Sequence, residues 1–134
     1  MSKENVALVR AIYDAFAKGD VPNVLGAMAP DIVWNEAENY PYADRNPYVG
    51  PGAVAEGVFM RIGGEWDGFS VKMDELLDAG DTVVALGRYT GTSKATGKAL
   101  NQQAAHIWRL KDGKVTRFQQ YADTLHVNRV LGKV

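Results

Sequence analysis

The 134-residue chain contains no cysteine, and this absence removes several classes of chemistry. Without thiols there can be no disulfide framework, no thiolate metal site and no cysteine nucleophile. The chain has only two histidines, so it offers no set of residues at the spacing of a metal centre. Gly50-Pro51-Gly52 lacks the lysine of a phosphate-binding loop. We therefore expect neither a metal ion nor a cofactor.

The chain also lacks an excess of charge and a long apolar run. Its formal net charge is -1, which provides no general attraction to nucleic acid or to an anionic membrane. No apolar stretch approaches membrane-spanning length, and the opening Met-Ser-Lys-Glu-Asn lacks the apolar core of a signal peptide. We expect a soluble, cytoplasmic protein that binds neither nucleic acid nor membrane.

The composition is ordinary for a globular protein, with 46% hydrophobic and 23% charged residues. A chain of this length is large enough to bury a core within one domain. No internal repeat, low-complexity tract or shift in composition marks a boundary. The sequence therefore predicts a single domain over residues 1–134.

The first half of the chain predicts three helices around one strand. Helical spacing of apolar residues, with capping and breaking residues at the ends, places the helices between Ser2 and Gly19, Asp20 and Pro30, and Gly50 and Gly63. Residues Asp31–Glu36 form the expected strand. The loop that follows, Ala37–Pro51, is rich in proline and tyrosine and resembles a lid more than a linker.

The second half predicts strands and turns. Strands are expected over Ser70–Leu77 and Thr82–Gly91, followed by a hairpin within Ala104–Thr124 that turns at Asp112-Gly113. Asp123 or Thr124 could cap a short helix that ends at Leu131.

Side-chain alternation assigns residues to the two faces of these strands. Ile32, Trp34 and Glu36 share one face of the first strand. His106 and Trp108 share a face of the hairpin, with Ala105, Ile107 and Arg109 on the other.

Helices followed by a run of strands predict an α+β domain, an antiparallel sheet with helices on one face. Such an arrangement leaves a concave space between sheet and helices, which requires apolar walls. The candidate wall residues are Tyr13, Phe16, Trp34, Phe59 and Trp108.

Four segments, VRAIYDAFAKGD, PDIVWNEA, GDTVVALGRYTG and AAHIWRLKDGKVTRFQQYADT, resemble the nuclear-transport-factor-2-like (NTF2-like) superfamily. Within it the chain is similar to SnoaL-like and ketosteroid-isomerase-related proteins. The resemblance implies a cone-shaped fold, in which a curved antiparallel sheet and about three N-terminal helices surround a pocket. It also implies a homodimer through the outer sheet face, where Ile107, Arg109 and Phe118 could lie.

The resemblance assigns roles to individual positions. The base of the ketosteroid isomerases corresponds to Glu36, and their oxyanion-binding aspartic acid corresponds to His106. Their tyrosine falls on Ile12, so Tyr13, one residue further, does not count as a match. SnoaL-type cyclases resemble the chain through a histidine at His106 and a late-strand acid, for which Asp123 and Gln120 are both candidate positions.

Each of these residues could instead have a purely structural role. His106 could be a general acid or base, or a neutral histidine bonded within the core. Asp123 could be an acid or only the cap of the last helix. Glu36 could be a base with a raised pKa, or it could pair with Arg88 or Arg109.

Two further residues have similar alternatives. Arg88 could hold an anionic part of a ligand, or it could lie at a dimer interface. Tyr40 could close on a ligand or pack the loop onto the core.

The sequence thus predicts a cofactor-independent isomerase, cyclase or hydratase that transfers a proton on a small or polycyclic apolar carbonyl compound. Glu36 or Asp123 would act as the base and His106 would stabilise the enolate. The expected substrate-binding residues are Tyr13, Phe16, Trp34, Tyr40, Phe59, Arg88, Trp108 and Gln120. The alternative is a non-catalytic domain for small-molecule binding or dimerisation.

Overall fold

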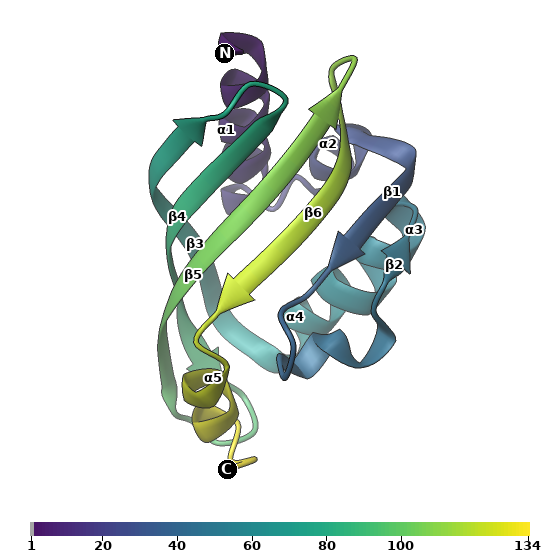
Figure 1. Cartoon of the computed structure of the whole chain (residues 1–134). Helices are drawn as coiled ribbons and strands as arrows, with labels where there is room; N and C mark the ends of the chain where they lie inside the picture. Colours follow the sequence, from purple (N-terminus) through teal and green to yellow (C-terminus); the bar gives the residue numbers. More distant parts are fainter. Residues whose placement is uncertain (1) are drawn as a thin grey trace.

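One curved sheet of six strands forms the framework, in the order β2-β1-β6-β5-β4-β3 (Figure 1). The computed structural model describes residues 2–134. The strands are β1 (Met28–Asn35), β2 (Tyr48–Val49), β3 (Trp66–Asp78), β4 (Thr82–Ser93), β5 (Ala99–Lys111) and β6 (Lys114–Ala122). The helices are α1 (Lys3–Ala17), α2 (Val21–Gly26), η1 (Pro41–Arg45), α3 (Pro51–Val54), η2 (Ala55–Phe59), α4 (Met60–Glu65) and α5 (Thr124–Val130). The predicted α+β class is confirmed.

The N-terminal helices begin where the sequence predicts. The Ser2 hydroxyl accepts a hydrogen bond from the Asn5 amide at 3.1 Å and caps α1. The second helix is shorter than expected, because α2 ends at Gly26 and residues 28–30 already belong to β1. Strand pairing explains the difference: Met28 is buried opposite Val115 of β6, and this contact outweighs the helical pattern.

The sheet is antiparallel except at one pair of strands. β1 runs parallel to β6, with Val33 opposite Arg117 and Asn35 opposite Gln119, so the expectation of a wholly antiparallel sheet is corrected here. No turn connects these two strands, which come from opposite ends of the chain. Turn signals in the sequence therefore could not reveal their relative direction.

The predicted hairpin is present, with Asp112 and Gly113 at positive φ in its turn. His106 and Trp108 point inward, as expected, while Ile107 and Arg109 point outward. Phe118 is buried opposite Trp108, so its predicted place on the outer face is wrong. A bulge between the pairs of Arg109 and Leu110 shifts the register by one residue, and this reverses the face of every later residue in β6.

The loop after β1 packs onto the core. Tyr40, Tyr42 and Tyr48 are 4%, 1% and 3% exposed. The loop leads into the third predicted helix, which is continuous over α3, η2 and α4 and has a π-helical middle turn. Among residues 2–134, no helix is long and apolar enough to span a membrane.

Gly57 in η2 is expected to resist even the smallest substitution. A Cβ at this position would overlap the ring of Tyr48, which packs directly against the helix. Gly57→Ala should therefore lower the free energy of unfolding by about 1–3 kcal/mol. The matched control is Gly63→Ala, at a helical glycine where an added Cβ would meet no atom beyond its own helix backbone within 4 Å; this change should stabilise the protein by about 0.5–1 kcal/mol. Urea unfolding of both variants checks this, and equal stabilities would contradict it.

Candidate functional site

A cavity of about 50 Å³ lies between the inner face of the sheet and the helices. Its walls are largely aromatic and aliphatic. The lining residues are Ile12, Tyr13, Phe16, Val24, Trp34, Glu36, Tyr40, Val58, Phe59, Ile62, Phe69, Val71, Tyr89, His106, Trp108, Phe118 and Gln120. Ligand pockets are commonly about 300–1,000 Å³. A polycyclic ligand would therefore have to displace part of the wall.

Most of the residues singled out in the sequence line this cavity. Those are Tyr13, Phe16, Trp34, Glu36, Tyr40, Phe59, His106, Trp108 and Gln120. Two predicted site residues, Asp123 and Arg88, do not.

Asp123 is exposed and caps α5, because its carboxylate accepts a hydrogen bond from the His126 amide at 3.1 Å. Gln120, not Asp123, faces the cavity from β6. The predicted place of Asp123 in the pocket is therefore wrong, and its capping geometry is the physical reason.

Arg88 lies on the outer face of β4, exposed, and its Nε donates to Asn101 Oδ1 at 2.7 Å. Its chain neighbour Tyr89 is buried and lines the cavity. Because successive side chains of a strand alternate between faces, Arg88 must point away, and its predicted role in the pocket is corrected.

Two tyrosines flank the His106 ring. Nδ1 lies 2.6 Å from Tyr13 Oη, and Nε2 is in hydrogen-bond contact with Tyr89 Oη. Burial lowers the pKa of His106 to about 3, so the imidazole is neutral near pH 7. Tyr89 was absent from the sequence prediction, although the alternation of buried Val83 and Ala85 in β4 points to it.

Each tyrosine oxygen also accepts a hydrogen bond from a second side chain. Trp108 Nε1 donates to Tyr13 Oη at 2.8 Å, and Gln120 Nε2 donates to Tyr89 Oη at 3.0 Å. A neutral imidazole has one N–H donor and one acceptor nitrogen. One tyrosine therefore donates to the acceptor nitrogen, while the other receives the imidazole N–H and keeps its own hydrogen for another partner. The site always has one hydroxyl hydrogen to offer.

Glu36 provides the acidic group of the cavity. Its side chain is 3% exposed, and Oε2 accepts a hydrogen bond from Trp34 Nε1 at 3.0 Å. Burial raises the pKa of Glu36 to about 7, against the lowering effects of the Trp34 bond and the Arg61 charge. The carboxyl group is thus balanced between its two protonation states near neutral pH.

The alternative pairing of Glu36 with Arg88 or Arg109 is wrong. Within residues 2–134 the ion pairs are Arg61–Asp44 and Lys94–Asp67.

The Asn46 side chain fixes the backbone of Glu36. Asn46 Oδ1 accepts from the Glu36 amide at 3.0 Å, and Asn46 Nδ2 donates to the Glu36 carbonyl at 2.8 Å. This two-point contact holds the acid where β1 ends. Among residues 2–134, no group of three or more histidine, cysteine, aspartate or glutamate side chains is arranged to hold a metal ion.

Several known proteins resemble the chain. An NTF2-like protein from Burkholderia thailandensis is 38% identical, with a TM-score of 0.91 and 98% of each chain covered. A second NTF2-like protein, from Burkholderia pseudomallei, is 28% identical, with a TM-score of 0.87, and the match covers 97% of this chain and 98% of the other.

Patulin synthesis protein F of Aspergillus clavatus is 32% identical over 85 residues, which span 63% of this chain but only 42% of the relative. The SnoaL-like domain family matches residues 9–118. Because this match covers most of the chain, the protein belongs to the SnoaL-like family of the NTF2-like superfamily.

Proposed function

We propose that the protein is a cofactor-independent enzyme that moves a proton on a small apolar carbonyl compound, as isomerases, cyclases and hydratases do. One observation carries this proposal: the buried carboxyl of Glu36, with a pKa of about 7, faces an aromatic cavity that also contains an oriented hydroxyl donor. A general base is most effective when its pKa lies near the working pH.

The proposed reaction begins with Glu36 as carboxylate. It removes a proton from the carbon next to the substrate carbonyl, and the electron pair of that C–H bond forms the enolate. The free hydroxyl hydrogen of Tyr13 or Tyr89 bonds to the oxygen on which negative charge develops. Protonated Glu36 then returns the proton to another atom of the same molecule, so no external acid or oxidant is needed.

The walls favour a neutral substrate. Among residues 2–134, no lysine or arginine lines the cavity and Glu36 is its one acidic residue, so an anionic ligand would lack a partner. The volume favours a small molecule over a polycyclic one unless Phe16 and Phe59 move. The name of the Aspergillus clavatus relative, a patulin synthesis protein, agrees with work on small organic molecules.

Activity measurements on a turnover substrate test the proposal. Glu36→Gln should lower kcat about a thousandfold, because general-base catalysis is typically worth about 10²–10⁴-fold. His106→Gln should also lower kcat, since it removes the group that orients both tyrosines. The wild-type rate should rise with pH and level off above about 7, where Glu36 is a carboxylate. His126→Gln, outside the cavity, is the control.

Full activity in both the Glu36 and the His106 variants would exclude this mechanism. The rival function, a non-catalytic binding domain, predicts a ligand that is bound and recovered unchanged at every pH.

A further inference from the structure

The residues that line the cavity are sorted by burial. Most of the polar ones lie deep and are buried: Glu36, Tyr40, Tyr89, His106 and Gln120. The partly exposed ones come from α1, the third helix and β3, and they form the mouth of the cavity: Tyr13, Phe16, Phe59, Ile62, Phe69 and Val71. The cavity therefore has a polar inner end and a largely apolar mouth.

Phe16 and Phe59 meet across this mouth. Their ring centres are 5.6 Å apart, although Phe16 belongs to α1 and Phe59 to η2. The Phe59 ring also meets the Trp34 indole edge-on, at 5.7 Å, so it extends from the mouth to the buried wall. Phe69, the third phenylalanine of the mouth, packs instead on Tyr89 of the sheet. The Phe16–Phe59 pair is thus an aromatic contact that closes the gap between two helices.

The buried walls are held more firmly than this pair. Trp34 stacks on Phe118 with ring centres 3.7 Å apart, and Trp108 Nε1 donates a hydrogen bond at 2.8 Å. Moving these groups would break a stacked contact or a buried hydrogen bond. Phe16 and Phe59 have no polar atom to hold them, and both are partly exposed. The two phenylalanines are therefore the parts of the wall that move at least cost.

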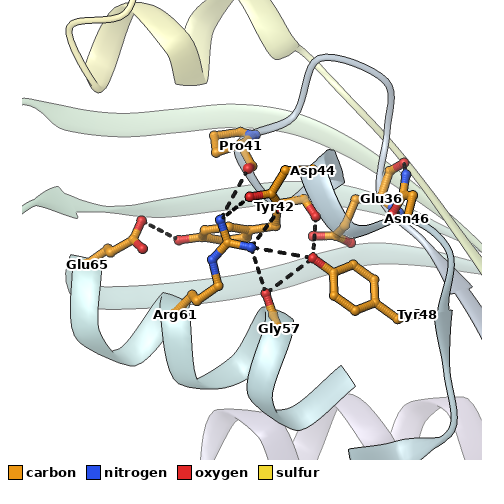
Figure 2. A network of polar contacts seen from close by, with 9 residues as sticks. All are labelled: Glu36, Pro41, Tyr42, Asp44, Asn46, Tyr48, Gly57, Arg61 and Glu65. Atoms are coloured by element: carbon orange, nitrogen blue, oxygen red, sulfur yellow. Dashed lines mark hydrogen bonds and ion pairs between the residues drawn. The ribbon is translucent and has the colours of Figure 1, made fainter. Parts of the chain in front are cut away.

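The backbone that carries Phe59 is a π-helical turn, Ala55–Phe59. Figure 2 shows the Gly57 carbonyl of this turn pointing toward two side chains. Arg61 Nη1 donates to this carbonyl at 3.3 Å, and Tyr48 Oη lies 3.4 Å from it. Turns of this kind are rare and often lie at functional sites. The turn is thus anchored through its backbone, while the Phe59 ring is left to move.

The size of the cavity requires such a movement. An apolar protein cavity that binds benzene measures about 150 Å³. The cavity here measures about 50 Å³, which is too small for one six-membered ring. A phenylalanine that turns outward vacates the space of one such ring.

We propose that Phe16 and Phe59 form a movable gate that determines specificity. The gate admits a one-ring carbonyl compound and excludes larger ones, and the carbonyl points toward the polar inner end. That the ligand is a carbonyl compound rests on the proposed function, whereas the size limit does not.

Binding of cyclohexanone and of the two-ring ketone 1-tetralone tests the size limit. Both are titrated into the intact protein and followed by NMR of the indole N–H groups of Trp34 and Trp108, which line the cavity. Wild type should bind cyclohexanone more tightly than 1-tetralone. Phe59→Ala should bind 1-tetralone at least about tenfold more tightly than wild type does, because a single methylene in a fitted pocket already changes binding about tenfold or more. Phe59→Leu, a milder truncation, should change the affinity in the same direction.

The rate of entry separates a gate from a fixed wall. Phe16→Ala and Phe59→Ala should raise the association rate of cyclohexanone about tenfold, because binding no longer waits for a ring to move. The matched control is Phe118→Ala, which removes the same ring from the buried wall and should leave the association rate unchanged. Equal association rates in Phe59→Ala and Phe118→Ala would overturn the proposal. So would 1-tetralone binding that is no tighter in the folded Phe59 variants than in wild type.

These measurements need no turnover, so the gate and the proposed function can fail separately. In deuterated water, an enzyme that removes a proton next to a carbonyl exchanges that proton for deuterium. Cyclohexanone that binds as expected, but exchanges no faster than in buffer alone, would count against the proposed function and leave the gate in place.

Discussion

Replacing Glu36 by glutamine is expected to stabilise the protein by about 3 kcal/mol at pH 8. The pKa of this carboxyl is raised from 4.5 to about 7 in the folded state. The folded protein therefore holds a proton that the unfolded chain has already released, and stability present below about pH 4.5 is lost as the pH rises through about 7. Glutamine stays neutral and still offers an oxygen to Trp34 Nε1.

Urea unfolding at pH 5 and pH 8 measures this effect. The wild type should be less stable at pH 8 than Glu36→Gln, while the two should approach each other at pH 5. Glu38→Gln, an exposed acid two residues away, should follow the wild type at both values. Equal stabilities of Glu36→Gln and wild type at pH 8 would show that the fold accommodates the carboxylate at no cost. A stabilising loss of a pocket acid is the pattern expected of a residue kept for function.

The fold could be predicted from local patterns because caps, turns and alternation are local. Ser2, Asp20 and Asp112-Gly113 each mark a boundary that the structure contains. The predictions that were wrong concern features that depend on contacts between distant parts of the chain. The burial of Met28 against β6 shortened a helix, and the bulge in the hairpin turned Phe118 inward. Neither effect can be read from a short stretch of sequence.

In the candidate site, too, local patterns predicted some features and missed others. Strand periodicity identified Trp34, Glu36, His106 and Trp108 as facing one space, and all four line the cavity. Tyr13 was expected as a wall residue but not as a match to a catalytic tyrosine. Its ring nevertheless brings Oη to 2.6 Å from His106, because a long side chain can reach a target that a count of backbone positions misses.

The ion pair between Arg61 and Asp44 could not be predicted in this way. Arg61 and Asp44 are 17 residues apart, and neither position carries a periodic signal. Nothing in the sequence distinguishes this arginine from Arg45, which lies exposed next to Asp44. Only the packing of the loop against α4 selects it.

His106 and Glu36 oppose each other in the pH dependence of stability. The His106 pKa is lowered from 6.5 to about 3, so the unfolded chain binds a proton that the folded protein rejects. Between about pH 4.5 and 6.5, folding therefore releases one proton from His106 and takes up one on Glu36. These two contributions cancel, and the wild-type stability should be nearly flat in that interval as far as these two groups are concerned.

His106→Gln should remove one side of this balance. The stability that wild type owes to neutral His106 is present above about pH 6.5 and is lost towards pH 3, by about 1.4 kcal/mol per pH unit and about 5 kcal/mol in all. The free energy of unfolding of His106→Gln, relative to wild type, should therefore rise with that slope as the pH falls. This holds whatever stability the substitution costs at neutral pH through lost hydrogen bonds. His126→Gln, which keeps His106, is the control. If the stability of His106→Gln and of wild type changed with pH in parallel, His106 would titrate in the folded protein as it does in the unfolded chain. The imidazole would then not be held neutral by burial. The argument that one tyrosine hydrogen is free for a substrate would fail with it.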